Sequence, residues 1–327
     1  SSTITATGGV RANFWDFNKQ TVVSPRLTLT YKPHWKRDIL FKASYGYYYQ
    51  PPFYREMRGF DGKLNPNIKA QQAIHYLLSA DYNFKMWQRP FKLIAAGYYK
   101  ELKNLIPYEI DNTRIRYFAK NNSVGYTQGV DLRINGEFVK GIESWATIGY
   151  LKTMENLSDD RKVTYFNAAG DSIIPGYTFD TKATDSSVVY PGYIPRPTDQ
   201  RITFGMFFQD YIPKVPNCKM YLNMQFGTGL PFGPPGHERW KQVFRMPPYR
   251  RVDIGLAYQI IKEDKPLPKA NVFHHVKAMF ISLEVFNLLQ IDNTVSYTWR
   301  TDVTNRQYAV PNYLTRRTLN LKLQVRF

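Results

Sequence analysis

The chain has 327 residues, a formal net charge of +18 and a mean hydropathy of −0.45. No apolar run approaches the ~18 residues that a membrane-spanning helix needs, so the sequence excludes a helical membrane protein. The 44 lysines and arginines form no block of five or more, which argues against a nucleic-acid partner, and the single cysteine, Cys218, excludes an internal disulfide.

The N-terminal part of the chain contains segments in which apolar and polar residues alternate with a period of two, the pattern of a β-strand with two different faces. The alternation is weak over Thr3–Trp15 and clear over Ile39–Gln50, which ends at Pro51-Pro52 because proline cannot donate to a ladder. Aromatic residues make up 16% of the chain, a share expected where aromatic girdles lie at two membrane interfaces. Further alternating segments cover residues 26–31, 74–84 and 91–102; the last has apolar residues on both parities, so its faces stay unassigned.

Turns and loops separate these strands. Residues 53–70 form a polar connection with the turn signals Asp61-Gly62 and Asn65-Pro66. Asp111-Asn112 predicts the tip of a short hairpin between residues 106–110 and 114–118. Residues 127–135 and 145–150 are expected to pair across a turn at Lys140-Gly141. The stretch from Met154 to Pro197 is rich in Asp, Ser, Thr, Gly and Pro, and we expect a long loop over residues 155–197, extracellular if the chain forms a barrel.

From Arg201 onward, alternating strands follow one another almost without interruption, over residues 201–209, 220–226, 251–259, 279–285 and 295–299. The last stretch, Arg317–Phe327, alternates without an exception and ends on an aromatic of its apolar face. In all, the sequence predicts roughly 12–14 antiparallel strands and no helix of any length.

The polar parity of these strands decides the fold class. It carries ionisable groups in mid-strand, which are natural on the wall of a hydrated lumen, whereas few strands are apolar on both faces as a large soluble β-sandwich would require. A β-propeller is disfavoured because no internal repeat is found. We therefore predict an all-β, antiparallel transmembrane β-barrel with its apolar faces toward lipid. The candidate lumen-facing residues are Asp81, Asp131, Arg133, Asp253, Glu284 and Lys322.

Two of these carboxylates have a basic residue two positions away, so we expect the ion pairs Asp131 with Arg133 and Asp253 with Arg251, although both could instead contact a solute. Arg55, Glu56 and Arg58, in the connection after Pro52, are candidates for ligand capture if that loop is extracellular. No Ser-His-Asp arrangement or metal-ligand spacing can be nominated, so no catalytic residue, metal or cofactor is expected, and the chain is not predicted to be an enzyme.

Several segments, which follow that family's order over nearly the whole chain, resemble TonB-dependent outer-membrane transporters. The strand-turn sequence LEVFNLLQIDN (283–293), the pair FGTGLPFGPP (226–235) and MPPYRRVDIGLAY (246–258), and the C-terminal strand resemble the end of that family's barrel. Four earlier segments resemble that family's mid-barrel strands: SPRLTLTYKP (24–33), YYQPPFYREM (48–57), LNPNIKAQQAIHYLLSADY (64–82) and GYTQGVDLRINGEF (125–138). Leu323, Val325 and Phe327 resemble the signal read by the barrel-assembly machinery.

This resemblance implies a 22-stranded barrel around an N-terminal plug, of which the chain, a single barrel domain over residues 1–327, is expected to be the C-terminal portion. It implies a receptor in the outer membrane of a Gram-negative bacterium that binds a scarce solute and imports it with energy from TonB, acting through the plug. The implied partners are outer-membrane lipid and lipopolysaccharide, the barrel-assembly machinery and a surface lipoprotein. Two alternatives stay open: a complete smaller barrel acting as a passive channel or enzyme, and a soluble β-protein that binds glycans or nucleic acid.

Overall fold

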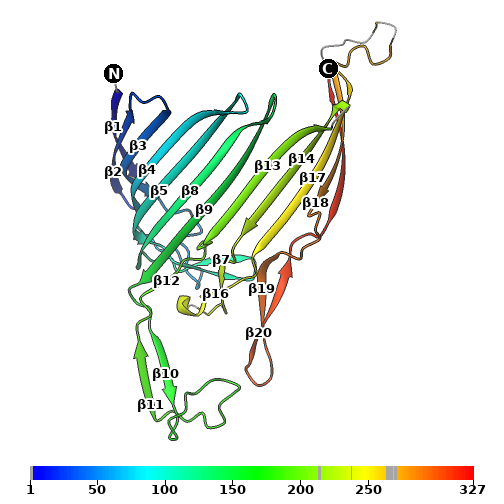
Figure 1. Ribbon diagram of the computed structural model, residues 1–327. Helices are drawn as coiled ribbons and strands as arrows, with labels where there is room; N and C mark the ends of the chain where they lie inside the picture. Colours follow the sequence, from blue (N-terminus) through cyan, green and yellow to red (C-terminus); the bar gives the residue numbers. More distant parts are fainter. Residues whose placement is uncertain (1–2, 213–214, 237, 263–267, 269–270) are drawn as a thin grey trace.

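The computed structural model describes residues 3–212, 215–236, 238–262, 268 and 271–327. Its dominant feature is a 13-stranded antiparallel sheet in which each long strand pairs with the next long strand along the chain, while the short strand β12 (Tyr193–Pro195) pairs with β9. Figure 1 shows these strands side by side as a single tilted wall. The wall strands are β1 (Thr3–Trp15), β2 (Gln20–Lys32), β3 (Asp38–Gln50), β4 (Gln71–Met86), β5 (Arg89–Leu105), β8 (Ser123–Val139), β9 (Ile142–Leu157), β13 (Ile202–Ile212), β14 (Val215–Gly227), β17 (Tyr249–Ile261), β18 (Ala278–Phe286) and β21 (Thr318–Arg326).

The two ends of the wall differ in their connections. At one, here called the short-turn end, most strands are joined by tight turns such as Trp87-Gln88, whose φ values of 52° and 61° suit a two-residue hairpin, and only the β17–β18 connection over residues 262–277 is longer. At the other, the long-loop end, the connections carry the four separate hairpins that the described residues form. These pair β6 (Tyr108–Asp111) with β7 (Arg114–Tyr117), β10 (Lys162–Phe166) with β11 (Asp185–Val189), β15 (Pro231–Phe232) with β16 (Phe244–Arg245), and β19 (Thr294–Thr301) with β20 (Gln307–Tyr313).

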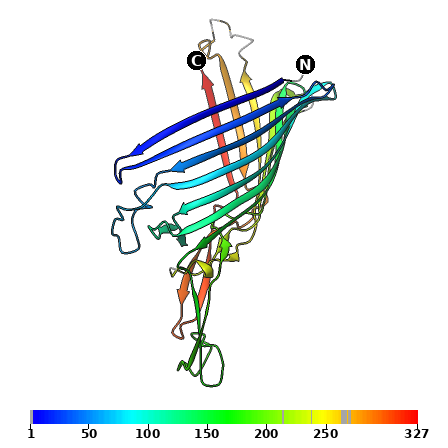
Figure 2. The same cartoon turned by 90° about the vertical axis from the view of Figure 1, so that its left-hand side faces the viewer.

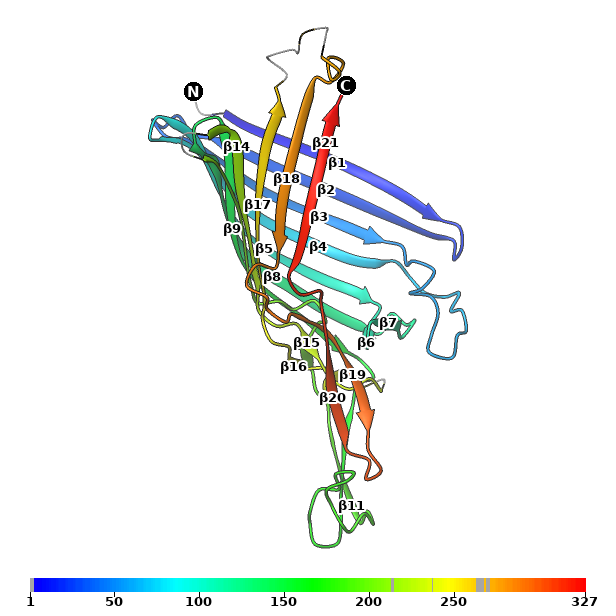
Figure 3. The same ribbon diagram turned by 90° about the vertical axis from the view of Figure 1, so that its right-hand side faces the viewer.

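The sheet is strongly curved, and Figures 2 and 3 show β1 and β21 as its two outer edges. Among the described residues, the hydrogen-bonded strand order begins at β1 and ends at β21, so the sheet is an open trough rather than a closed cylinder. The predicted all-β antiparallel class is confirmed, and the observed number of wall strands lies within the predicted range. The part of the chain described here includes one 3-10 helix, η1 (Arg239–Lys241), and no helix of the length and apolar character needed to cross a membrane.

The outer, convex face of the wall carries the apolar parity of each strand. Leu78, Leu321 and Leu323 are 68%, 70% and 62% exposed there, and an apolar surrounding would favour such exposure. The faces of β5, unassigned from sequence, follow from its register with β4: Leu93 pairs with Tyr82 and therefore points outward. The concave face carries the opposite, mostly polar parity.

Aromatic side chains form two groups on the outer face, as expected for interface girdles. Near the short-turn end, Phe91 contacts Phe84 and Phe138 with ring centroids 5.7 and 5.0 Å apart. Toward the long-loop end, tyrosines of neighbouring strands form a continuous row with centroid spacings of 5.1, 6.2, 6.2 and 5.5 Å. The members of this row are Tyr45, Tyr76, Tyr99, Tyr126 and Tyr193.

Two expected segments differ from the structure. The region predicted as irregular from Met154 is ordered at its start, because β9 continues to Leu157, and it also contains the β10–β11 hairpin. The strand predicted over residues 295–299 exists as part of β19, yet it belongs to a separate hairpin with β20 and not to the wall. Its partner β20 was missed because it contains Pro311, which weakens a strand pattern but is tolerated at the edge of a two-stranded hairpin.

Candidate functional site: the inner wall and the loops at its end

The concave face carries charged side chains that pair with one another across neighbouring strands. Asp81 of β4 is largely buried and receives Lys42 Nζ at 3.0 Å and Lys92 Nζ at 2.9 Å, from the strands on either side. Because a buried carboxylate needs compensating partners, this bridge ties β3, β4 and β5 together across the inner face. The candidate residue Asp81 therefore lies on the predicted face, where it acts as a cross-strand tie.

The two expected ion pairs have different outcomes. Arg251 Nε lies 2.7 Å from Asp253 Oδ1, and the same oxygen accepts the Asn287 backbone N–H at 2.8 Å, so that pair is confirmed. Among the ion pairs of the described residues, none joins Asp131 to Arg133, and that expectation is wrong. The Arg133 guanidinium instead lies over the Trp145 ring of β9, 5.5 Å from its centroid, a cation–π contact with a diagonal neighbour on the next strand.

The two remaining inner-face candidates lie on β18 and β21. Glu284 accepts hydrogen bonds from Tyr221 Oη at 2.9 Å and from Asn320 Nδ2 at 2.7 Å, so it joins strands on both of its sides. Lys322 is paired in register with Ser282 on the same face. All six lumen-facing candidates thus carry the inner parity of their strands.

The motif LEVFNLLQIDN (283–293) covers the end of β18 and the start of the connection that follows this strand. Asn287, at a φ of 52°, accepts the Ile291 N–H at 3.1 Å and donates to the Ile291 carbonyl at 2.9 Å. Asn293 then brackets the backbone of Arg250, accepting from its N–H and donating to its carbonyl, both at 2.8 Å. These two asparagines fix the chain at the long-loop end of β17 and β18, which explains the motif structurally.

The three loop candidates for ligand capture are not brought into one site. Glu56 is buried and accepts the Phe53 backbone N–H at 2.8 Å and the Gln71 side-chain amide at 3.3 Å, so it holds its own loop together. Arg58 donates to the Gly62 carbonyl at 3.0 Å, whereas Arg55 is exposed. The loop is anchored by a small apolar cluster of Met57, Ile68 and Ile106, against which Trp15 and Tyr117 pack.

Sequence reasoning missed a buried ionic cluster where the loop of residues 228–248 folds back onto the wall. Arg239 is fully buried, donates to Glu155 Oε1 through Nη2 at 2.8 Å and through Nε at 3.2 Å, and also reaches the Pro195 carbonyl at 3.1 Å. Glu155 is itself buried at the end of β9. This buried ion pair, in which two N–H groups of Arg239 donate to one oxygen of Glu155, fixes the loop's position, since leaving either charge alone would be costly.

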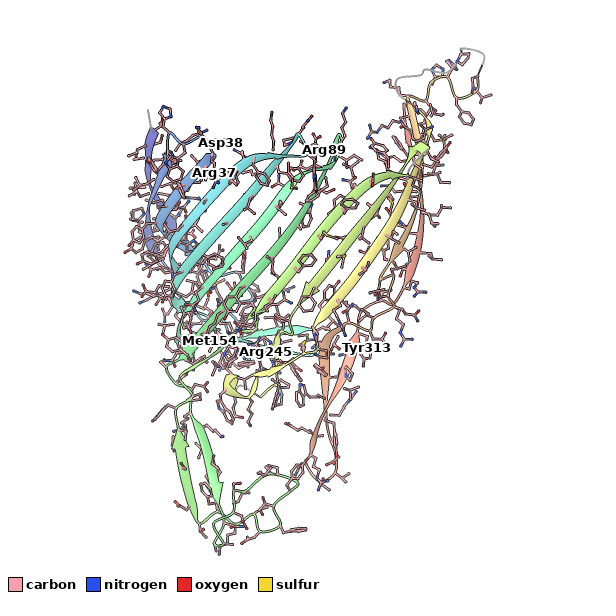
Figure 4. The ribbon with its side chains drawn as sticks, in the orientation of Figure 1. Arg37, Asp38, Arg89, Met154, Arg245 and Tyr313 are labelled. Carbon is pink, nitrogen blue, oxygen red and sulfur yellow. The ribbon has the colours of Figure 1, made fainter. Side chains whose placement is uncertain are left out.

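A second carboxylate, Asp199, continues this cluster. It is fully buried, accepts the Thr153 backbone N–H at 2.7 Å, and pairs with Arg201 at 2.8 Å and with Arg245. Figure 4 shows Arg245 beside Met154 at the long-loop end of the wall, opposite the end that carries Arg37, Asp38 and Arg89. Together Glu155 and Asp199 join the loop of residues 228–248 to β9 and to the segment that precedes β13.

Two further hairpins meet this loop, so that segments far apart in sequence form one assembly. Glu109 of β6 accepts the Gly236 N–H at 3.1 Å, a contact between residues 127 positions apart. Asn112, at the tip between β6 and β7, accepts from Asn312 Nδ2 at 2.9 Å across 200 positions. On the other side of the β19–β20 hairpin, Phe232 stacks on Tyr297 with ring centroids 4.3 Å apart. We call the hairpins β6–β7 and β19–β20 and residues 228–248 the mouth assembly.

The most distant part of the molecule holds a contact between the two projecting segments. Arg306, in the turn between β19 and β20, donates through Nε to the Gly176 carbonyl at 2.9 Å and lies over the Tyr177 ring at 4.6 Å. Gly176 has a φ of +79°, and a side chain there would collide with the Thr304 carbonyl. Glycine is therefore required for this tip contact on both counts.

One acid of the long-loop end is strongly perturbed. Burial raises the pKa of Asp160 to about 6, and the nearby acids Asp159 and Glu238 act in the same direction, while Arg239 opposes them. Its Oδ2 atom has no hydrogen-bond partner. Desolvation without a close partner favours the protonated form of a carboxyl, which places this titration close to neutral pH.

Comparisons with known proteins agree with this architecture. The outer membrane transporter YddB from Escherichia coli matches with a TM-score of 0.58 and 15% identity, over 99% of this chain and 43% of that one. The siderophore receptor PiuA from Acinetobacter baumannii matches with a TM-score of 0.56 and 14% identity, over 93% of this chain and 36% of that one. The ferric-catecholate import receptor Fiu from E. coli K12 matches with a TM-score of 0.54 and 14% identity, over 92% of this chain and 34% of that one. These likenesses concern the fold alone.

No relative was found among curated proteins. The chain spans about two fifths of the length of the solved structures that it matches. The family model described as TonB dependent receptor-like, beta-barrel, matches residues 1–288, which is most of the chain. On this evidence the chain belongs to the TonB-dependent receptor-like β-barrel family.

Proposed function

We propose that the protein is an outer-membrane receptor of a Gram-negative bacterium that binds a scarce solute at the cell surface and imports it with energy from TonB. The mouth assembly supports this proposal most directly. Two hairpins and one loop, from parts of the chain up to 200 residues apart, are held in a fixed arrangement at one end of the wall. A passive pore needs no such structure, whereas a receptor needs a preorganised surface at its entrance.

The orientation follows from the lengths of the connections. In outer-membrane barrels the short turns are periplasmic and the longer loops are extracellular, so the long-loop end would face the outside. The outer-face tyrosine row would then lie at the outer interface, beside lipopolysaccharide, and the loop of residues 51–70 would also be extracellular. TonB would act from the periplasmic side through a plug held inside the complete barrel.

The C-terminal strand would serve assembly of the receptor. Leu323 of β21 and Phe327, the residue after this strand, are exposed, and the barrel-assembly machinery could read them together with Val325. A surface lipoprotein that rests on the projecting hairpins is a further proposed partner. The proposal includes no catalytic step, because binding and passage of a solute need none.

Uptake by whole cells tests the central claim. Cells that produce the intact receptor are given labelled solutes, beginning with a ferric catecholate, the cargo in the name of one matched structure. We expect accumulation above the external concentration, dependent on the receptor and lost in a strain without TonB. Uptake that only equilibrates, and that continues without TonB, would instead identify a passive channel.

Labelling of intact cells tests the orientation independently. Single cysteines are placed at Ser187 in β11 and at Lys140 in the turn at the other end, after Cys218 has been replaced by serine. A membrane-impermeant maleimide should modify position 187 in intact cells and position 140 only after the outer membrane is opened. The reverse pattern would show that the long-loop end is periplasmic.

A further inference from the structure

A groove lies in the outer, convex face of the wall. Its volume is about 610 Å³, and its lining comes from six neighbouring strands, β1 to β5 and β8. Small residues form its floor: Ala43, Ala80, Ala95 and Gly97. Larger apolar and aromatic residues of the same face stand around this floor: Ile4, Leu29, Tyr31, Phe41, Leu78 and Val130. The remaining lining residues have the inner parity, so their side chains lie on the opposite face of the sheet: Thr30, Lys42, Ser79 and Ala96. An occupant of the groove therefore meets almost only hydrocarbon.

The protein leaves this groove open, although it covers comparable gaps on its inner face. Among the described residues, no atom outside the chain neighbours of Gly97 lies within 4 Å of the place where a Cβ would be added. On the inner face, Gly129 and Gly255 lie instead against the rings of Tyr98 and Tyr221. The two inner gaps are filled by the chain's own tyrosines, whereas the gap at Gly97 is left for something outside the chain.

The groove lies between the two aromatic groups of the outer face. On β4 this face presents Tyr76, Leu78, Ala80 and Tyr82 in succession. Tyr76 belongs to the tyrosine row, and Tyr82 stacks on Phe84 at the short-turn end, with ring centroids 5.0 Å apart. Because aromatic girdles mark the two interfaces of a membrane barrel, the residues between them lie at the depth of the lipid hydrocarbon.

The groove rises from the middle of the wall to the girdle at the short-turn end. Val130, on one side, is near the middle of β8. On the other side, Ile4 is the second residue of β1 and is paired with Tyr31, the last residue but one of β2. Trp35, in the turn that follows β2, packs edge-on against Phe41 with ring centroids 5.8 Å apart. This is the course of an acyl chain that hangs from a headgroup at the short-turn interface.

Shape decides between a lipid chain and a second copy of the protein as the occupant. Inside a bilayer, contacts are driven by close packing and not by the exclusion of water, so an unfilled groove forfeits dispersion contacts along its whole lining. The outer face of a second copy is itself convex and would leave the floor uncovered. A flexible acyl chain can follow the floor, and it then contacts residues on both sides as well as beneath it.

We propose that one acyl chain of a phospholipid from the leaflet at the short-turn end occupies this groove. The groove itself rests on the membrane setting of the family and not on solute uptake. The choice of a phospholipid rests on the orientation proposed above, because the short-turn end then lies in the periplasmic leaflet, which consists of phospholipid, and lipopolysaccharide lies in the other leaflet. The bound lipid is distinct from lipopolysaccharide at the tyrosine row.

Native mass spectrometry tests the site. The intact receptor is extracted from outer membranes in mild detergent and washed until loosely held lipid is removed. We expect a population that carries one phospholipid, and a fall of about tenfold in that population when the groove is filled by the double variant Ala95→Leu/Gly97→Leu. Ala146→Leu is the matched control, since Ala146 has the outer parity of β9 and lies outside the groove, paired with Ile134 and Met206. It should leave the phospholipid population unchanged.

Several results of this measurement would overturn the proposal. These are an unmodified receptor without phospholipid, equal phospholipid populations in the two variants, and a receptor dimer or a lipopolysaccharide adduct that only the double variant loses. Unfolding midpoints of the variants in phospholipid vesicles are compared first, so that a folding defect is recognised separately.

Photo-cross-linking locates the chain. The receptor is placed in vesicles with a phospholipid that carries a diazirine at the end of one acyl chain, and labelled residues are identified by mass spectrometry. We expect labelling to be concentrated at Leu78 and Val130, and to fall in the double variant to the level at Ile148, which lies on the outer face beyond the groove. Equal labelling of Leu78 and Ile148 in the unmodified receptor would contradict a fixed chain.

The cysteine labelling described above separates this inference from the proposed function. A phospholipid adduct that the double variant loses supports the groove whether or not a solute is imported. If the long-loop end proves to be periplasmic and the groove holds lipopolysaccharide, the proposed orientation and the choice of lipid fail together. If the orientation is as proposed and the double variant keeps its phospholipid, the groove proposal alone fails.

Discussion

A lysine placed on either face of the wall gives a quantitative test of which face meets lipid. Ile148 of β9 points outward between Leu132 and Phe204, with which it is paired on either side. It lies seven residues beyond Gly141, the last residue of the tight turn. At ~3.3 Å per residue and a strand tilt of ~40°, this is roughly 18 Å along the membrane normal, near the middle of the ~25 Å apolar band once the turn itself is allowed for.

Ile148→Lys should therefore lower the free energy of unfolding by ~2–4 kcal/mol, the cost of a lysine at the bilayer midplane. Thr203→Lys is the matched control, since Thr203 is paired with Gly149 one position away on the opposite face. It should change stability by less than ~1 kcal/mol, because a lumen-facing lysine stays hydrated. The measurement is reversible urea unfolding of the intact receptor in phospholipid vesicles, followed by tryptophan fluorescence. Equal losses for the two variants would refute the assignment of the faces.

Three further predictions concern the long-loop end. Arg239→Met leaves Glu155 buried without its main partner, so opening of residues 228–248 should become easier by ~3–5 kcal/mol, measured as faster amide hydrogen exchange in that loop; unchanged protection would contradict this. Gly176→Ala should release the contact between the two hairpin tips, whereas Gly170→Ala, at a similar φ of +85° but with open space around it, should not; cross-linking between the tips distinguishes the two. Because burial raises the pKa of Asp160 from 3.8 to about 6, the local fold is fully stabilised below the lower value and loses that stabilisation as pH rises through 6. Intrinsic-rate-corrected exchange around it should thus be faster at pH 7.5 than at pH 5, and Asp160→Asn should remove the difference.

The wall could be predicted from sequence because each of its strands carries its own evidence. Period-2 alternation in a segment such as 127–135 indicates a strand and both of its faces without knowledge of any other part of the chain. Where both parities are apolar, as in residues 91–102, the faces depend on the partner strand. The pairing of Leu93 with Tyr82 decides which face is which, and the sequence of one segment does not determine its pairing register.

The mouth assembly could not be predicted because its contacts join residues that have no local pattern. Arg239 lies in a stretch rich in proline and glycine and reads as an ordinary surface charge, yet it is fully buried against Glu155. The hairpin tip at Asn112 was expected from its turn residues, whereas its bond to Asn312 was not. Conversely, Glu56 reads as a capture residue and is in fact a buried brace of its own loop.

The long-range contacts of the mouth assembly also imply an order of folding. Each long wall strand pairs with the next one along the chain, so each pairing closes a loop far shorter than 200 residues and at a lower entropic cost. The bond between Asn112 and Asn312 spans 200 positions and requires β6–β7 and β19–β20 to be in place already. Contacts of such high sequence separation form late, so the wall should be inserted before the entrance matures. An inserted but immature receptor, with a complete wall and an unformed mouth, would then be the natural last intermediate, and slow maturation of the entrance would set when a new molecule first binds its solute.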